Sequence, residues 1–305
     1  MSFCALSTGS KSRLIGLIIA FIMVISSCFV LVQNGLNFGL DFTGGYITEF
    51  TTERPTTVAE LHTLIATEHV DKTIITAQGP QHFQLREAPN SDKTSSWQTQ
   101  LEQNGVNISV LSAAYLGSQV GDELFEQGCL ALLASLVAVM IYLAIRFEWR
   151  LGVGSVVALL HDLTLVLGLF ALLGLEFNLT VLASLLAIIG YSLNDSIIVG
   201  DRVRELLRLS NNKQIDTNTV INQAIKSTLA RTMITSGTTL ATVACIWLLA
   251  GSALNGFAIA LFVGIVVGTF SSICIAATLP QLLGLSSQNY QLTLDDKSQA
   301  YMDMP

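Results

Sequence analysis

Six long runs of apolar residues dominate the hydrophobic pattern of this chain. An α-helix rises about 1.5 Å per residue, so roughly 20 apolar residues are needed to cross the ~30 Å hydrocarbon core of a bilayer. The runs that approach this length are Leu14–Val32, Leu124–Ile145, Leu151–Leu173, Leu179–Gly200, Met233–Ala250 and Leu254–Leu279. The pattern therefore predicts a polytopic α-helical membrane protein with six spans.

The segment between the first two runs has a different periodicity. Tyr46–Thr51 alternates as a strand does, and Thr57–His69, which Thr56 or Thr57 can cap, places its apolar residues on one helical face. The pattern then predicts a strand at Thr73–Gln78, a turn at Gly79-Pro80, a strand at His82–Glu87, a helix at Ser91–Asn104 and a strand at Val106–Leu111. The order β-α-β-β-α-β predicts a ferredoxin-like α+β domain.

These elements divide the chain into five parts. We expect an N-terminal tail (1–13), a first span (14–32), an α+β domain (33–123), a bundle of the second to sixth spans (124–279) and a C-terminal tail (280–305). Ser286–Pro305 lacks an apolar face, so we expect it to be disordered.

Composition agrees with a membrane protein. Of the 305 residues, 51% are hydrophobic and 12% are charged, and the mean hydropathy is +0.59. Lys11 and Arg13 before an apolar run that reaches Cys28 resemble a lipoprotein signal peptide, but Phe29–Val32 extends the run to the length of a spanning helix.

The distribution of cations predicts the orientation. Eleven of the 15 Lys and Arg residues lie in or beside the tails and the second and fourth connections: Lys11, Arg13, Arg146, Arg150, Arg202, Arg204, Arg208, Lys213, Lys226, Arg231 and Lys297. Short loops rich in Lys and Arg stay in the cytoplasm. Both termini are therefore expected in the cytoplasm and residues 34–123 on the opposite side of the membrane.

The segment 34–123, expected outside the cytoplasm, is acidic and contains no cysteine. Its charge equals the net charge of the whole chain, −7, so nucleic acid is not an expected partner. The five cysteines lie in the N-tail or in the spans: Cys4, Cys28, Cys129, Cys245 and Cys274. We expect the outer domain to fold without disulfides, and the sequence suggests neither a metal site nor a cofactor.

Ionisable residues at membrane depth are the candidates for function, because a charge there needs a partner, water or a role in transport. His161 and Asp162 fall in the third span, Asp195 falls in the fourth, and Arg231 immediately precedes the fifth. An ion pair between Asp195 and Arg231 would hold the carboxylate ionised, and protonation would release the arginine. Such a pair is a candidate ion-translocation site.

Structural interpretations of the same residues remain open. Asp195 and Asn194 are also suited to hydrogen bonds with neighbouring helices, and His161-Asp162 to orienting backbone or water. Nearby oxygens of Asn194, Ser192 and Ser196 suit either H⁺ or Na⁺ as the coupling ion.

Two glycine patterns have structural interpretations. Asp41-Phe42-Thr43-Gly44-Gly45 lacks the Lys and the following helix of a phosphate-binding loop. It instead predicts a tight chain reversal in which Asp41 caps backbone amides. The sixth span carries a stripe of small residues, Gly256, Ala260, Gly264, Gly268 and Ser272, on which another helix of the chain or of a partner can pack.

Several motifs together resemble the SecF family of bacterial protein-export subunits. They are Gly39–Gly45, Arg146-Phe147-Glu148-Trp149-Arg150, His161-Asp162, Gly190–Ser196 followed by Asp201–Glu205, and Arg231–Ser236. The resemblance implies a membrane fold of the RND superfamily in the bacterial inner membrane, with residues 34–123 in the periplasm, and pairing with SecD. It also implies association with the SecYEG channel, with YajC as a further partner, and action on a translocating preprotein.

The family resemblance further implies that the ion gradient drives late, periplasmic-side steps of Sec-dependent export. Asp195 matches the family's ion-carrying aspartate and Arg231 its partner arginine. The sequence departs from the family pattern in the tail and at Leu111–Leu116, where a Gly-Pro-containing approach to the second span is usual.

Two other functions fit the sequence less well. An intramembrane aspartyl protease would need Asp162 and Asp195 to share a proton, but neither lies in the Gly-x-Gly-Asp setting of such enzymes. An RND-type exporter of small molecules or lipids would need a larger outer region. The expected protein is therefore a transport subunit and not an enzyme.

Overall fold

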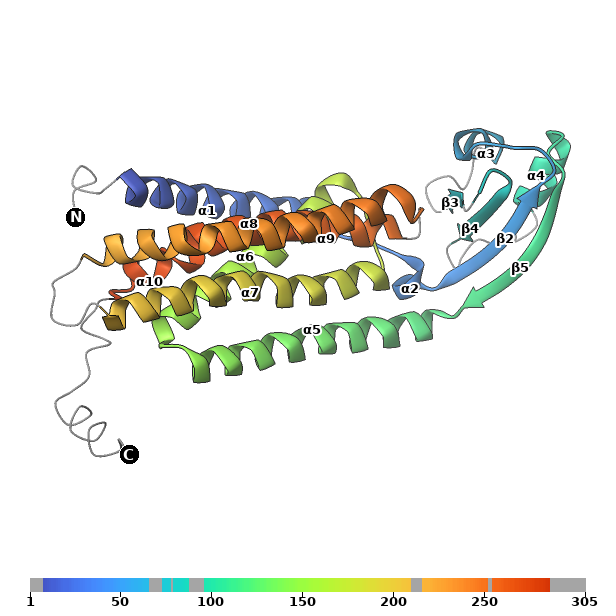
Figure 1. The fold of residues 1–305 in the computed structure, drawn as a ribbon. Coiled ribbons are helices and arrows are strands. Elements are labelled where there is room, and N and C mark those ends of the chain that lie inside the picture. Colours follow the sequence, from blue (N-terminus) through green and yellow to red (C-terminus); the bar gives the residue numbers. More distant parts are fainter. Residues whose placement is uncertain are drawn as a thin grey trace, which may run out of the picture.

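The computed structural model describes residues 8–65, 73–77, 79–87, 96–209, 216–251 and 254–285. It is elongated, with a bundle of long helices and a small α+β domain at one end (Figure 1). The long helices are α1 (Thr8–Asn34), α5 (Ser118–Arg146), α6 (Trp149–Leu173), α7 (Leu179–Leu209), α8 (Thr217–Leu249) and α9 (Asn255–Ser271). α9 continues into the π-helical turn η4 (Ser272–Ala276) and the short α10 (Leu279–Leu282).

The six predicted spans are all present as helices long and apolar enough to cross a membrane, α9 being counted with its continuation to Leu282. Several helices extend beyond the predicted apolar runs: α5 begins at Ser118, α7 ends at Leu209, and α8 begins at Thr217. Polar turns remain helical outside the hydrocarbon, whereas hydropathy delimits only the apolar part. Arg231, which we expected just before the apolar part of the fifth span, accordingly lies within α8, near its middle.

The bundle has an inner and an outer set of helices. Of the 18 most apolar consecutive residues in each span, 56% are buried in α6, 56% in α7 and 61% in the α9 span. The corresponding shares are 11% in α1, 11% in α5 and 17% in α8. The core contains Leu159, Val166, Phe170, Leu185 and Ile188. Polar groups on the inward faces of α6, α7 and α9 are therefore enclosed by protein within this chain.

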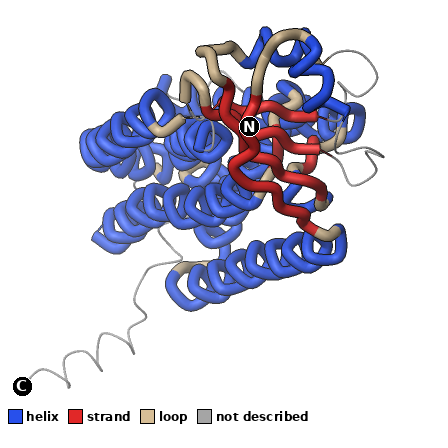
Figure 2. Tube along the Cα trace, turned by 90° about the vertical axis from the view of Figure 1, so that its right-hand side faces the viewer, coloured by secondary structure: helices blue, strands red, loops and turns tan. Residues whose placement is uncertain are grey.

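The α+β domain contains a four-stranded antiparallel sheet (Figure 2). Its elements are β2 (Gly45–Thr52), α3 (Val58–Leu64), β3 (Thr73–Ala77), β4 (His82–Glu87), α4 (Ser96–Gln103) and β5 (Ile108–Leu116). The strand order β3-β4-β2-β5 is that of a split βαβ arrangement. Thr57 caps α3 by accepting a hydrogen bond from the Glu60 amide at 3.2 Å.

The apolar faces of α3, α4 and the sheet form the core of this domain. Phe50, Phe83 and Leu85 from the strands meet Leu61 of α3 and Trp97 of α4. The described part of the domain contains no cysteine, so its stability comes from this core.

The last strand is longer than the sequence predicted. We expected it to end at Leu111, but β5 continues to Leu116, which pairs with Gly45 of β2. Ser112, Ala113 and Ala114 carry little strand signal, and cross-strand pairing with β2 decides their conformation. Only Gly117 separates β5 from α5. Some predicted boundaries fall on residues outside the described ranges: the last residues of Thr57–His69 and Thr73–Gln78, and the first residues of Ser91–Asn104. The predicted disorder of Ser286–Pro305 falls there too.

Candidate functional site

The Asp41–Gly45 motif forms a tight turn where the α+β domain meets the bundle. Residues 40–43 form the short helix α2, after which Gly44 and Gly45 have φ values of 70° and 147°. A Cβ atom on Gly44 would lie 2.8 Å from the backbone oxygen of Leu116. The positive φ angles and the close backbone together explain the two glycines. The motif therefore forms a tight turn, from which β2 runs on into the α+β domain (Figure 1).

Asp41 caps the start of α7. Its Oδ2 atom accepts a hydrogen bond from the amide of Leu179, the first residue of α7, at 3.0 Å. Asn178 Oδ1 accepts from the amide of Val181 at 3.1 Å. These bonds satisfy amides that a helix leaves unpaired at its N-terminus. The prediction that Asp41 caps backbone amides is confirmed, and Asp41 ties this turn to α7.

Further contacts join the α+β domain to the bundle at the same place. β1 (Asn37–Phe38) pairs in parallel with β6 (Glu176–Phe177), and the rings of Phe42 and Phe177 stack with their centroids 5.9 Å apart. Arg86 of β4 forms an ion pair with Glu176 at 3.1 Å, with about a fifth of each side chain exposed. The segment that leads into α7 is therefore in direct contact with the α+β domain.

Asp162 is fully buried and fully hydrogen-bonded. Its Oδ2 atom accepts from the hydroxyls of Ser192 on α7 at 2.5 Å and Ser271 on α9 at 2.9 Å. His161 Nδ1 lies 2.9 Å from Oδ1, while His161 Nε2 is buried without a partner among the described residues. Three inner helices thus meet at one carboxylate, and the arrangement agrees with the structural interpretation of His161-Asp162.

Asp195 is equally buried but has no such set of donors. Its residue exposure is 1%, and neither carboxylate oxygen has a hydrogen-bond partner among the described residues. The hydroxyl of Ser236 on α8 lies close enough to Asp195 to interact with it, and it also bonds to the Thr269 hydroxyl of α9 at 2.8 Å. Within the same described ranges, the hydroxyls of Ser196 and Thr232 are also buried without partners. The unsatisfied acceptor capacity of this site distinguishes Asp195 from Asp162.

Arg231 and Asn194 do not contact Asp195 in this structure. Arg231 is exposed on α8 and interacts with Asp195 electrostatically, but no ion pair within 4.0 Å joins the two among the described residues. Asn194 is exposed on the face of α7 away from the buried aspartate, because successive helical residues point about 100° apart. The interpretation that places the Asn194 oxygen at Asp195 is wrong for this chain, and the role of Arg231 stays a prediction.

The two aspartates do not form a protease-like pair. Asp162 is engaged by His161, Ser192 and Ser271, whereas Asp195 faces α8 and α9 near Ser236. Sequence reasoning missed Ser271, Ser236 and Thr269 as parts of these polar centres. Hydroxyl residues in otherwise apolar spans were the available signal. The π turn that follows Ser271 is a second indication, since π turns are frequent at functional sites.

The small-residue stripe of α9 packs inside the chain. A Cβ on Gly256 would approach Val181, one on Gly264 would contact Ile188, and one on Gly268 would approach Ser192. These contacts advance in the same direction along both helices, so α7 and α9 run parallel at close range. Ala260 is fully buried between them. Of the two expected partners for the stripe, the structure therefore shows a helix of the same chain.

Comparisons with known proteins match the chain along most of its length. The family model "Protein export membrane protein SecD/SecF, C-terminal" matches residues 96–285, and the "SecD/SecF GG Motif" matches residues 29–56, which include Asp41–Gly45. The protein translocase subunit SecF of Vibrio alginolyticus is 36% identical over 296 residues, which cover 95% of this chain and 93% of that protein. SecF of Escherichia coli O157:H7 is 35% identical, covering 89% and 86%.

Solved structures of SecDF have the same fold. The crystal structure of SecDF from Thermus thermophilus, described as a translocon-associated membrane protein, superposes with a TM-score of 0.77 at 33% identity and covers 93% of this chain. A SecDF structure in a super-membrane-facing form gives a TM-score of 0.71 at 32% identity. This chain spans 39% of the length of each SecDF chain. From its motifs, its six spans and these relatives, the chain belongs to the SecD/SecF family of protein-export membrane proteins and is of the SecF type.

Proposed function

We propose that this chain, paired with a SecD-type half, uses a transmembrane gradient of H⁺ or Na⁺ to drive late, periplasmic-side steps of preprotein export. SecYEG and YajC are the proposed further partners. The work is done by ion binding and helix movement, with no catalytic centre or bound cofactor. Asp195 is proposed to take up and release the ion, and Arg231 to respond to the change in its charge.

The observation that supports this role most is the contrast between two buried carboxylates. Asp162 receives donors from three side chains, so its charge is compensated and serves to hold α6, α7 and α9 together. Among the described residues, neither carboxylate oxygen of Asp195 has a donor within hydrogen-bond distance and geometry, and the Ser236 hydroxyl lies close by. An unpaired buried carboxylate is costly there unless it binds a proton, a cation or a movable positive group.

The same helix connects this site with the α+β domain. Asp195 lies near the middle of α7, and the first residue of α7 is held by Asp41. A change in the packing of α7 against α8 and α9 would therefore move the turn that carries β2. This path supports coupling of ion occupancy to movement of the outer domain.

The outer domain also supports the presence of a partner half. β5 is at the edge of the sheet and pairs only with β2 among the described strands. Val110, Leu111 and Tyr115 on it are 43%, 57% and 57% exposed. Long exposed apolar edge strands are ready to pair with another strand, so a partner domain or an extended preprotein segment fits this edge.

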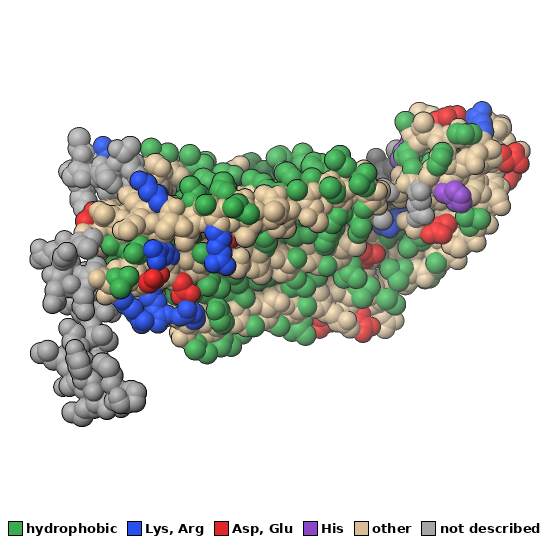
Figure 3. All heavy atoms as spheres, viewed as in Figure 1, with side chains coloured by type: hydrophobic (Ala, Val, Ile, Leu, Met, Phe, Trp, Pro, Cys, Tyr) green, Lys and Arg blue, Asp and Glu red, His purple; other side chains and the backbone are tan. Residues whose placement is uncertain are grey.

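The positions of Lys and Arg support an orientation with the α+β domain in the periplasm. On the face shown in Figure 3, they gather at the end of the bundle remote from that domain. In a chain with its five cysteines replaced by alanine, we expect Thr63→Cys in α3 to react with an impermeant thiol reagent added from the periplasmic side. The matched Thr219→Cys at the start of α8 should be protected until the cytoplasmic side is opened. The reverse labelling pattern would overturn the orientation.

Reconstitution tests the function itself. Vesicles containing this chain, its SecD half and the SecYEG channel should complete preprotein export faster when an ion gradient is imposed. Applying a Na⁺ gradient at fixed pH, and a pH gradient without Na⁺, identifies the coupling ion. An export rate that is the same with and without either gradient would refute the proposed function.

A further inference from the structure

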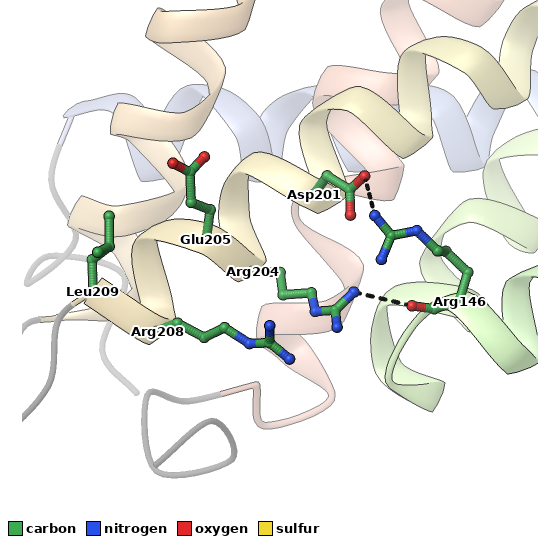
Figure 4. Close-up of a pocket in the computed structure, with 6 residues that line it drawn as sticks. All are labelled: Arg146, Asp201, Arg204, Glu205, Arg208 and Leu209. Atoms are coloured by element: carbon green, nitrogen blue, oxygen red, sulfur yellow. Dashed lines mark hydrogen bonds and ion pairs between the residues drawn. The ribbon is translucent and has the colours of Figure 1, made fainter. Parts of the chain in front are cut away.

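A cationic pocket lies between the end of α5 and the last turns of α7, apart from the two buried aspartates. It has a volume of about 490 Å³ and is lined by Arg146, Asp201, Arg204, Glu205, Arg208 and Leu209 (Figure 4). The lining contains three guanidinium groups and two carboxylates, so its net charge is positive. In Figure 4 the arginines extend towards the space between the two helices, while Glu205 points away.

Both carboxylates of the pocket already have cationic partners. Asp201 accepts from Arg146 at 2.8 Å, and Glu205 accepts from Arg202, outside the lining, at 2.6 Å. Arg204 differs from these. Its Nη1 atom donates to the backbone carbonyl of Arg146 at 3.2 Å, and it forms no ion pair with a carboxylate of the described residues. Arg204 therefore brings a positive charge that an anion can compensate.

The neighbouring side chains place the pocket at the depth of lipid headgroups. Arg146 is the last residue of α5, and Tyr142 and Trp149 beside it are 47% and 58% exposed. Exposed aromatic residues of this kind gather at the membrane–water interface. Leu209 in the lining is 71% exposed, and Ile141 on α5 is 55% exposed. The pocket thus combines cations with an apolar surface that continues along the membrane helix.

We propose that this pocket binds the phosphate group of an anionic phospholipid, with Arg204 as the main contact and the acyl chains lying along the exposed apolar side of α5. Guanidinium groups bind phosphate oxygens through paired charge-assisted hydrogen bonds. Basic pockets between spanning helices are suited to anionic headgroups, whereas a water-soluble phosphate would gain nothing from the adjoining apolar surface. The lipid would fill the space between α5 and α7 and restrain α5, the helix that continues β5. This proposal does not depend on ion coupling at Asp195.

Native mass spectrometry of the purified full chain, titrated with phosphatidylglycerol or phosphatidylcholine, tests it. Wild-type protein should retain phosphatidylglycerol in preference to the zwitterionic lipid. Arg204→Gln should lower the affinity for phosphatidylglycerol about fivefold, as expected for one cation near an anionic surface, and leave phosphatidylcholine unchanged. Lys226→Gln is the matched control, since it removes one positive charge from an exposed position on α8, outside the pocket lining. It should keep the wild-type affinity.

The possible results distinguish a lipid in this pocket from a lipid elsewhere and from a soluble anion. Equal retention of the two lipids by the wild-type chain would overturn the proposal without reference to any variant. Wild-type affinity in a folded Arg204→Gln chain, or an equal loss in Lys226→Gln, would overturn the assignment to this pocket. Displacement of phosphatidylglycerol by millimolar inorganic phosphate would assign the site to a soluble anion instead.

Discussion

Replacing Gly264 by Leu is expected to destabilise the helix bundle by about 3 kcal/mol, at the upper end of the range for an overpacked core. A Cβ at this position already contacts the Ile188 side chain, and the rest of a leucine side chain has no space between α9 and α7. Because the two helices run parallel along the whole stripe, one of them must move away. That movement would also separate Ser192 from Ser271, which share the carboxylate of Asp162.

Thermal unfolding of the purified chain measures this effect. Gly190→Leu is the matched control, because Gly190 lies on the exposed side of α7 and no atom lies within 4 Å of a Cβ built there. It should unfold at nearly the wild-type temperature. If Gly264→Leu instead has wild-type stability and only fails to copurify with the SecD half, the stripe is an interface between subunits.

The stripe illustrates what the sequence alone could not decide. Small residues at every fourth position predict that some helix approaches closely, and that much is confirmed. Their spacing contains no information on which helix it is. The partner follows only from the three-dimensional contacts of Gly256, Gly264 and Gly268 with α7.

Spans and strands were predictable to different degrees. The six apolar runs predicted all six spans, because the cost of placing polar backbone in lipid forces helices there. The outer domain was predictable in element order, since alternation and helical periodicity differ clearly. The length of β5 was not predictable, because Ser112, Ala113 and Ala114 are held as a strand by pairing with β2 rather than by their own propensity.

The sequence predicted which aspartates belong to the candidate site, but not how their hydrogen bonds are arranged. Charged residues inside apolar runs identified Asp162 and Asp195 directly. Which of them is satisfied depends on hydroxyl donors from other helices, and Ser271 is distant from both in the sequence. The exposed position of Asn194 follows from the rotation of α7, which hydropathy does not determine.

Asp195→Asn is expected to abolish the stimulation of export by the ion gradient. The amide is close to the carboxylate in size, so packing is kept, but it can neither lose a proton nor hold a cation with a full charge. The chain should insert and assemble with its SecD half at normal levels. Arg231→Lys keeps a positive charge and loses the planar fork that grips a carboxylate, so we expect a partial loss.

Asp162→Asn provides the internal comparison. Ser192 and Ser271 both donate to one oxygen of Asp162, and the other oxygen faces His161. An amide presents only one acceptor oxygen, so at least one buried donor loses its partner at a cost of about 1–3 kcal/mol. This variant should therefore lower the stability and the amount of the chain, with gradient-driven export reduced in proportion to the protein lost.

The most direct measurement is gradient-stimulated preprotein export by vesicles that contain equal amounts of wild-type, Asp195→Asn or Asp162→Asn chain, each with the SecD half. Normalising to the assembled complex separates loss of coupling from loss of protein. We predict that Asp195→Asn shows no stimulation per complex and that Asp162→Asn retains most of it. Normal stimulation in an Asp195→Asn complex of normal abundance would contradict the assignment of ion coupling to this residue.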